Sequence, residues 1–472
     1  MVERGSGGGL MLTRRDLIHS RQFLRGRLTA ALLAQKPDPL DWPGRRLAGA
    51  SLAAVMVTVI ALAAVGVYGK FFPSGNKRWQ ACDAVVIERE TGTKYYCRPD
   101  LRTLYPVANY ASARLLLDRP KDPYLVARAS LTWPKGPRVG IVGAPDNLPD
   151  PKKLRTDPWS ICGVTARDAV GYPVPLTYVY AGWRPGGGDG LGSAAVLVVD
   201  PNGARHLIWH GRRHAIRDDA IVTDALRVAP AQAHPVTLAW LDVLPAGAPL
   251  GAIKVANRGR ESSWRKGTKV GEVLVDPATQ QHYVVKPNSV DRVTELQARI
   301  LLADPGYPGT AAPTPVGGTP LTVDGNLPTG GILPAEPTPT VVPVVSGTGV
   351  CVRISDAGDG RVVTVGVPVT GDLDAAARPP ATAAGVPLAD HVAVEPGRGV
   401  VVLAKPAPQA TGGTWFLVTD HGIAYPVPSP EVLGQLGYQP ERAIPLPTGL
   451  MARVPHGPVL EPTAAVRAIP PG

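Results

Sequence analysis

Apolar residues cluster into one long run near the start of this chain of 472 residues. Leu47 to Gly69, LAGASLAAVMVTVIALAAVGVYG, contains 23 residues and no charge. A helix of this length covers about 34 Å, which is enough for a hydrocarbon layer of about 30 Å. The alternative is a signal peptide, but its charged region would be 46 residues long and no A-x-A site follows the run. The run therefore predicts an uncleaved transmembrane helix over 47–69.

The segment before this run has the period of an amphipathic helix. Within Thr13–Lys36, the apolar positions that can share one face are Leu17, Ile18, Leu24, Leu28 and Leu32. Such a helix can dock a partner helix or lie on a membrane surface. We favour partner docking, with Leu17, Leu24 and Leu28 as the docking stripe.

After the apolar run, short strand-like segments alternate with turns, and one unit recurs. The unit is two strands, a turn and a short leucine-bearing helix, as in LYPVANYASARLLL and AYPVPSPEVLGQLGY. Four copies can be aligned at the step before the helix: Tyr105-Pro106, His214-Ala215, Asp291-Arg292 and Tyr425-Pro426. We expect four ββα-like repeats, with Tyr105, Pro106, Tyr425 and Pro426 as repeat anchors.

Two kinds of segment lie between the repeats. Strand-like sequences at 157–167 and 350–369 indicate a central β-rich domain that the repeats flank. Ala303–Gly349 contains ten prolines and is typical of a surface loop or linker, so the third repeat is expected to lack its last segment.

The expected fold is therefore a single-span membrane protein with an α+β extracytoplasmic region, in which four ββα-like repeats flank a central β-rich domain. Its expected parts are a cytoplasmic segment (1–46), the transmembrane helix (47–69), repeat 1 (70–154), a first central part (155–190), repeat 2 (191–252), repeat 3 with adjoining central strands (253–302), the proline-rich loop (303–349), a second central part (350–395), and repeat 4 with the C-terminal tail (396–472).

The charge distribution gives the direction of the span. The net charge is +11, and residues 1–46 carry nine Lys and Arg against four Asp and Glu. The positive-inside rule places this segment in the cytoplasm and the remaining residues outside the plasma membrane. The part after the span is only mildly basic, so we expect no nucleic-acid partner.

All four cysteines, Cys82, Cys97, Cys162 and Cys351, follow the span, where disulfides can form. Four cysteines permit three pairings. Cys82 and Cys97 flank a predicted turn and could lock a hairpin, which would leave Cys162 to pair with Cys351 in the central domain.

No motif assembles an active site. His206, His210 and His214 recur every fourth residue, but their repeat context is strand and turn, so they do not share a helix face. Trp264–Lys269, WRKGTK, lacks the first glycine of a phosphate loop and has Lys before Gly. We expect no enzyme, no metal site and no cofactor.

Several stretches of the chain resemble EccB, the single-span membrane component of the actinobacterial type VII (ESX) secretion machinery. They are SRQFLRGRLTAALLAQKPDP, GVYGKFFPSG, ETGTKYYC, LYPVANYASARLLL, ARASLTWPKGPRVGIVGAPDNLP and WFLVTDHGIAYPVPSPEVLGQLGY. The similarity extends over nearly the whole chain.

This resemblance implies a structural core component of the secretion complex in the inner membrane. Its implied partners are EccC, EccD, EccE, the mycosin protease and further copies of itself, as a dimer within a higher, hexameric assembly. It also implies four periplasmic repeats around a central domain, and its central disulfide maps onto Cys162 and Cys351. The alternatives are a peptidoglycan-binding membrane anchor and, third, an ATPase.

Overall fold

The chain divides into an N-terminal unit, Met1–Lys77, and a C-terminal unit, Arg78–Gly472. The structure is a computed structural model that describes residues 13–34, 43–71, 77–118, 121–168, 170–317, 321, 323–327, 337–358, 361–368, 381–382 and 384–470.

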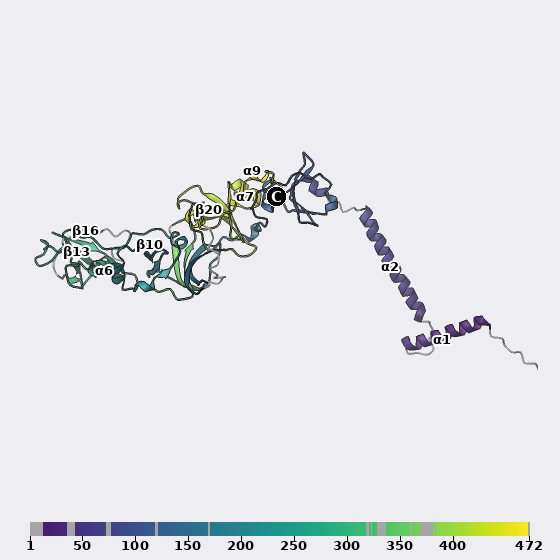
Figure 1. The fold of residues 1–472 in the computed structure, drawn as a ribbon, viewed down its shortest axis with the longest axis horizontal. Coiled ribbons are helices and arrows are strands. Elements are labelled where there is room, and N and C mark those ends of the chain that lie inside the picture. Colours follow the sequence, from purple (N-terminus) through teal and green to yellow (C-terminus); the bar gives the residue numbers. More distant parts are fainter. Residues whose placement is uncertain are drawn as a thin grey trace, which may run out of the picture. The chain divides into compact units, whose positions relative to one another are not determined.

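The N-terminal unit consists of two long helices (Figure 1). They are α1 (Arg14–Ala34) and α2 (Pro43–Phe71). In the described part of the chain, α2 alone is long and apolar enough to cross a membrane, with its most apolar stretch at Gly49–Gly66. The single candidate span therefore falls inside the range that the apolar run predicts.

A six-stranded sheet forms the centre of the C-terminal unit, with strand order β19-β6-β5-β17-β18-β7. Its strands are β5 (Trp159–Arg167), β6 (Pro173–Tyr180), β7 (Asp189–Gly190), β17 (Thr348–Ile354), β18 (Arg361–Pro368) and β19 (His391–Ala393). β5 and β17 are adjacent and antiparallel although almost 190 residues separate them, because β17 enters the sheet next to the β5–β6 hairpin.

Four smaller sheets share one strand order, three antiparallel strands with a fourth strand parallel to the first. Small sheet 1 has β1 (Val86–Glu88), β2 (Lys94–Arg98), β3 (Thr103–Pro106) and β4 (Tyr124–Val126). Small sheet 2 has β8 (Val196–Val199), β9 (Arg205–Trp209), β10 (Arg212–Ala215) and β11 (His234–Pro235). Small sheet 3 has β12 (Val273–Val275), β13 (His282–Val285), β14 (Val290–Val293), β15 (Thr314–Pro315) and an added β16 (Val323–Asn326). Small sheet 4 has β20 (Gly399–Lys405), β21 (Thr414–Thr419), β22 (Ala424–Val427) and β23 (Ile444–Pro447).

The third strand of each small sheet leads into a short helix: α3 (Tyr110–Leu115), α4 (Asp219–Leu226), α6 (Glu295–Ala303) and α7 (Pro430–Leu436). Polar residues precede the helices, as N-cap preferences predict. Thr294 and Gln297 form a complete capping box at α6, and Asn109 accepts a hydrogen bond from the Ser112 amide at α3. The remaining helices are η1 (Lys77–Ala81), η2 (Arg128–Ser130), η3 (Pro151–Lys153), η4 (Pro230–Gln232), α5 (Leu238–Leu241), η5 (Pro440–Arg442), α8 (Thr448–Met451) and α9 (Pro462–Ala465).

The proline-rich stretch 303–349 contributes strands, which corrects the expectation of a plain loop or linker. β15 pairs in parallel with β12, and β16 pairs in parallel with β14. The Ala195 amide also donates to the Thr340 carbonyl. Proline is tolerated here because these are edge strands, where a missing N–H breaks no ladder.

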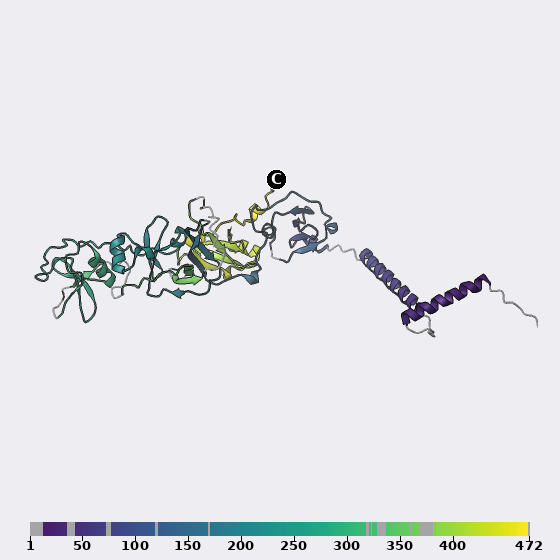
Figure 2. The same ribbon diagram turned by 60° about the horizontal axis from the view of Figure 1, so that its bottom comes forward.

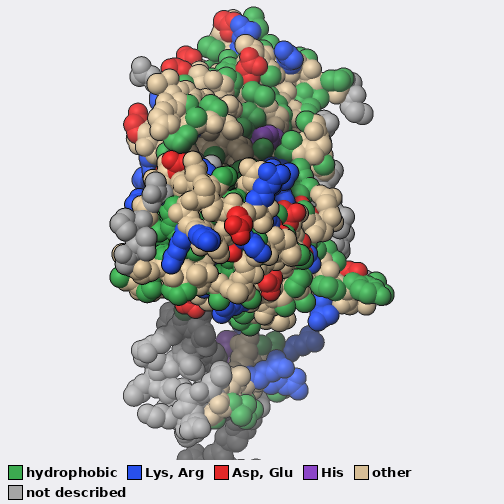
Figure 3. Space-filling view, turned by 90° about the vertical axis from the view of Figure 1, so that its left-hand side faces the viewer, with side chains coloured by type: hydrophobic (Ala, Val, Ile, Leu, Met, Phe, Trp, Pro, Cys, Tyr) green, Lys and Arg blue, Asp and Glu red, His purple; other side chains and the backbone are tan. Residues whose placement is uncertain are grey.

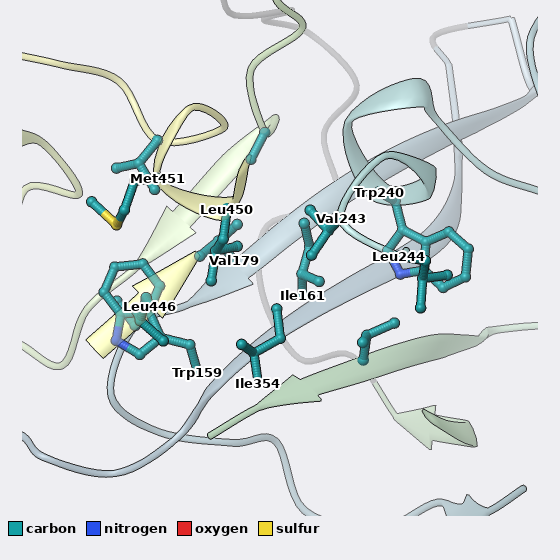
Figure 4. Close-up of a cluster of buried hydrophobic side chains, with 14 of the residues drawn as sticks. Trp159, Ile161, Val179, Trp240, Val243, Leu244, Ile354, Leu446, Leu450 and Met451 are labelled. Atoms are coloured by element: carbon teal, nitrogen blue, oxygen red, sulfur yellow. The ribbon is translucent and has the colours of Figure 1, made fainter. Parts of the chain in front are cut away.

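One hydrophobic core joins the central sheet to small sheets 2 and 4. It contains Trp159 and Ile161 of β5, Trp240 of α5 and Val400 of β20, each 0% exposed. The yellow-green strands of small sheet 4 lie beside the central strands in both ribbon views (Figures 1 and 2). The close-up shows Ile354 of the central sheet between Leu446 and Leu244 (Figure 4).

The short helices pack in pairs. α4 contacts α6, and Leu226 and Ile300 belong to one cluster between small sheets 2 and 3. α3 contacts α7 and α9 in a second cluster between small sheets 1 and 4. The C-terminal tail strengthens this second pair, since the Ile469 amide donates to the Arg138 carbonyl.

Small sheet 3 carries charges of both signs at its surface. The face that contains β13, β16 and α6 shows Lys and Arg side chains interspersed with Asp and Glu, between exposed hydrophobic side chains (Figure 3). The residues around small sheet 3 also form ion pairs, such as Arg258 with Asp304 and Arg299 with Glu295.

Small sheet 1 contains a buried carboxylate. Glu88 is 1% exposed and accepts hydrogen bonds from Arg128 Nε at 2.6 Å and Tyr95 Oη at 2.9 Å. Burial raises the pKa of Glu88, but the hydrogen bonds from Arg128, Tyr95 and Thr91 outweigh burial, and the pKa falls to about 2. The carboxylate therefore remains ionised in the folded protein down to acidic pH.

Replacing Glu88 should reveal this carboxylate in the pH dependence of stability. Because the folded pKa lies below 4.5, the stabilisation is complete above about pH 4.5 and is lost as the pH falls towards 2. We expect Glu88→Gln to lower the free energy of unfolding near pH 7 by about 3 kcal/mol and to flatten its acid dependence. Urea unfolding at several pH values measures both effects. Glu261→Gln, on an exposed side chain, is the control, and equal effects of both variants would contradict the prediction.

Candidate functional sites for anchoring and assembly

The leucine stripe of α1 is exposed. Leu17 is 55% exposed, Leu24 59% and Leu28 62%. At about 100° per residue these positions lie within about 40° of each other around the helix axis. The same geometry puts Arg21 about 40° from Leu17, so arginines border the stripe and are not confined to the opposite face. Phe23, which the sequence analysis did not single out, is also 58% exposed.

The structure joins Cys162 to Cys351 across the central sheet. The two residues face each other in the register of β5 and β17, with their Cα atoms 4.0 Å apart. Both are buried, in a cluster with Val164 and Tyr178 on the sheet face opposite to Trp159 and Ile161. A link over 189 residues restricts the unfolded chain strongly, by about 5 kcal/mol in the chain-entropy account.

The structure also joins Cys82 to Cys97, with Cα atoms 5.1 Å apart. Cys97 lies on β2, but Cys82 follows η1 and precedes β1. The bond therefore encloses the turn between β1 and β2, as the spacing predicts, and it also ties the end of η1 to the sheet because Cys82 lies outside β1. Trp79 of η1 is fully buried and packs edge to face on Trp133, with ring centroids 5.0 Å apart.

The anchors Tyr105 and Tyr425 each lie against a glycine. A Cβ atom on Gly136 would come within 2.6 Å of Cε1 of Tyr105, and a Cβ on Gly457 would come still closer to the Tyr425 ring. His214 occupies the same step in small sheet 2, and its ring lies equally tightly on Gly247. None of the three glycines has a positive φ, so space rather than backbone conformation requires glycine.

The backbone repeats the same pattern at these three places. The glycine amide donates to the carbonyl of the residue before the ring: Gly136 to Leu104, Gly247 to Arg213 and Gly457 to Ala424, at 2.8–3.0 Å. A second backbone hydrogen bond follows in each case. The carbonyl of the residue after Tyr105, His214 or Tyr425 accepts it from the amide three residues after the glycine. These bonds run from Val139 to Pro106, from Leu250 to Ala215 and from Leu460 to Pro426.

A shared sequence signal marks these contacts. The segments PKGPRV (134–139), PAGAPL (245–250) and PHGPVL (455–460) all have Pro, then Gly two residues later, then Val or Leu three residues after the glycine. We call them the edge segments, because each covers the outer side of β3, β10 or β22. The positions of the three rings could be aligned from the sequence, but the glycines that face them were not predicted.

Small sheet 3 has a different contact at the step before its helix. The residue that corresponds to Tyr105, His214 and Tyr425 is Asp291. A Cβ atom on Gly325 of β16 would lie 3.8 Å from its Oδ1. Lys286 Nζ lies 3.3 Å from Asp291 Oδ2. An ion pair and a regular strand thus replace the aromatic ring and the edge segment.

The three spaced histidines do not converge. His206 lies on β9, His210 in the turn with φ +49°, and His214 on β10, where Nδ1 lies 2.8 Å from the Ala248 carbonyl oxygen. Burial lowers the pKa of His214. Among the residues described here, no group of three His, Cys, Asp or Glu side chains is placed to hold a metal.

These features define the class of the chain: one candidate apolar span near the N-terminus and a large β-rich α+β region. Residues 10–470 match the family described as "Type VII secretion system ESX-1, transport TM domain B". The chain belongs to this EccB family of type VII secretion proteins.

Relatives and solved structures agree with this assignment. "ESX-5 secretion system ATPase EccB5" of Mycobacterium tuberculosis is 31% identical over 66% of this chain, and the match spans 63% of that relative's length. "ESX-2 secretion system ATPase EccB2" of the same species is 30% identical over 82% of this chain and 81% of the relative.

Two solved structures extend the similarity. A chain in the structure of an intact ESX-5 inner membrane complex is similar over 99% of this chain and 98% of its own length, with 26% identity and a TM-score of 0.61. The EccB3 dimer from the ESX-3 core complex is similar over 82% of this chain and 100% of its own, with 26% identity and a TM-score of 0.60.

Filling the space under a ring tests whether these contacts hold the small sheets together. Gly457→Ala places a methyl group in steric conflict with the Cε1 and Cδ1 atoms of Tyr425. We expect this to lower the free energy of unfolding by about 1 to 3 kcal/mol. Chemical denaturation measures the change. Gly449→Ala in α8 is the matched control, because nothing lies within 4 Å of its Cβ and alanine favours a helix. Equal stability of the two variants would contradict the anchoring role.

Proposed function

We propose that this chain is a structural core component of the type VII secretion machinery in the inner membrane. The observation that carries the proposal is the similarity over 99% of the chain to a member of an ESX-5 inner membrane complex. In this role α2 anchors the protein, α1 docks partners, and the C-terminal unit builds the extracytoplasmic part of the complex.

The charge pattern supports one orientation of the span. Arg45 and Arg46 precede the apolar run and residues 1–46 carry an excess of five positive charges, which favours a cytoplasmic N-terminus. All four cysteines follow the span and are paired, which fits an oxidising compartment outside the membrane. The protein is therefore proposed to cross the membrane once, with its C-terminal unit in the periplasm.

We infer that the four small sheets are four copies of one repeat, arranged around the central sheet. Their common strand order, the helix that follows each third strand, and the repeated ring-on-glycine contact support this inference. The domain boundaries proposed from the sequence remain, with one change: the third repeat extends to β16 and so takes in part of 303–349.

The proposed partners are EccC, EccD, EccE and the mycosin protease, together with further copies of this chain as a dimer within a hexameric assembly. The EccB3 dimer and the ESX-5 inner membrane complex among the similar structures support self-association. The exposed leucine stripe of α1 supports docking at the cytoplasmic side. Several similar surfaces on one compact unit suit assembly around an axis.

We propose that the chain has no ATPase activity of its own, although relatives carry that word in their names. The sequence contains no GxxxxGK[ST] segment to cradle phosphates. Purified full-length protein should therefore hydrolyse ATP no faster than buffer containing Mg²⁺. Turnover that stays with the protein through purification and disappears on unfolding would overturn this point.

Replacing the leucine stripe tests the docking role. Leu17→Ser, Leu24→Ser and Leu28→Ser together should remove the companion proteins that co-purify from detergent-solubilised membranes, while the chain remains in the membrane through α2. Gln22→Ser with Thr29→Ser, about 120–140° away from Leu17 on the same helix, is the matched control and should retain the companions. Mass spectrometry of the purified material measures the loss.

The same preparations separate a scaffold from a peptidoglycan anchor. A scaffold loses its companions when the stripe is replaced. A peptidoglycan anchor would sediment with purified cell wall equally well before and after the change and would bring no companions in either case. That second result would contradict the proposed function.

A further inference from the structure

The central sheet carries a cavity of about 320 Å³ on the face opposite to the main core. Its floor is formed by Ser160 of β5, Cys351 and Arg353 of β17, and Val362 and Thr364 of β18. These residues are neighbours in the strand register, since Arg353 lies opposite Ser160 on one side and Val362 on the other. We call this the arginine cavity.

A glycine-rich loop forms the other wall of the arginine cavity. Arg184, Pro185 and Gly186–Gly188 line it, and Gly187 and Gly188 have φ of +84° and +80°. A Cβ on Gly188 would come within 2.9 Å of the Val365 carbonyl oxygen, so glycine allows the loop backbone to approach β18 closely. The loop thus leaves a space over the sheet that both polar and apolar residues line.

Two arginines, Arg184 and Arg353, line this space, and no acidic side chain among the described residues lines it. Within the described part of the chain, neither Arg184 nor Arg353 has an ion-pair partner. Elsewhere in the C-terminal unit, Arg155 pairs with Glu395 and Arg453 with Asp242, whereas Arg114 and Arg442 donate to backbone carbonyls. Arg353 is partly buried on a central strand, where an unpaired charge is costly unless an anion or water satisfies it.

We propose that the arginine cavity binds a small oxyanionic ligand that carries a phosphate or carboxylate group. The planar guanidinium of Arg353 offers two parallel N–H donors to such a group, and Arg184 adds a second positive charge from the loop. The Ser160 hydroxyl on the floor supplies a further polar contact. The volume is at the lower end of that of small-molecule sites, which suits a compact anion rather than a polymer.

Calorimetric titration of the full-length protein in detergent tests this site. Inorganic phosphate and succinate are the two probes, at constant ionic strength adjusted with sodium chloride. We expect one of them to bind saturably, and the preferred probe distinguishes a phosphate ligand from a dicarboxylate. Arg353→Gln and Arg184→Gln should each weaken binding at least about tenfold, because each removes a charge-assisted hydrogen bond.

Two controls keep the outcome interpretable. Arg292→Gln changes an exposed arginine outside the cavity and should leave binding unchanged. Arg184 is exposed on the loop, so its variant tests the site even if Arg353→Gln does not fold. Absence of saturable binding by both probes, or equal binding by all three variants and the unmodified protein, would overturn the proposal.

The disulfides provide an independent readout. Cys351 lines the cavity, so a bound anion should slow reduction of the Cys162–Cys351 bond by dithiothreitol. The Cys82–Cys97 bond lies in small sheet 1 and should be reduced at the same rate with and without the anion. Alkylation followed by mass spectrometry gives both rates. Equal slowing of both bonds, or no slowing of either, would contradict a ligand in the arginine cavity.

Discussion

Burial of one face of the central sheet under small sheets 2 and 4 is the packing constraint on which the C-terminal unit depends. Trp159 of β5 and Trp240 of α5 are fully buried there, and truncating a tryptophan in such a core typically costs about 3 to 5 kcal/mol. The core unites segments from 159 to 454, so the central sheet cannot form its core without both neighbours. Small sheets 1 and 3 then attach through helix pairs to small sheets 4 and 2.

The opposite face of the central sheet carries a second, smaller buried cluster, which contains Cys162, Tyr178 and Cys351. There the Cys162–Cys351 bond fixes the register of β5 and β17, and the arginine cavity lies beside it. Edge segments cover β3, β10 and β22, which protects these strands from pairing with other chains. Covering these three edge strands leaves other surfaces of the C-terminal unit for assembly, which fits the role proposed for this chain.

The sequence predicted what local patterns determine. The 47–69 run coincides with the apolar part of α2. The rings at Tyr105 and Tyr425 were aligned because Tyr-Pro-Val recurs around both. These features depend on neighbouring residues only.

Features that depend on contacts between distant residues could not be predicted from the sequence. A glycine such as Gly457 looks like an ordinary turn residue until the ring that lies on it, 32 positions away, is known. β16 forms within a proline-rich stretch that does not favour strands. It was not predicted because its pairing with β14 depends on tertiary contact rather than on β propensity. The hydrophobic core shared by small sheets 2 and 4 and the central sheet also has no local sequence signal. An apolar strand does not indicate which sheet it packs against.

α2 and the paired cysteines indicate a cytoplasmic N-terminus and an extracytoplasmic C-terminal unit, and protease treatment of intact spheroplasts tests this topology most directly. With one epitope tag at each end of the chain, the account predicts that the C-terminal tag is digested while the N-terminal tag remains protected until the membrane is permeabilised. Protection of the C-terminal tag in intact spheroplasts would contradict the account.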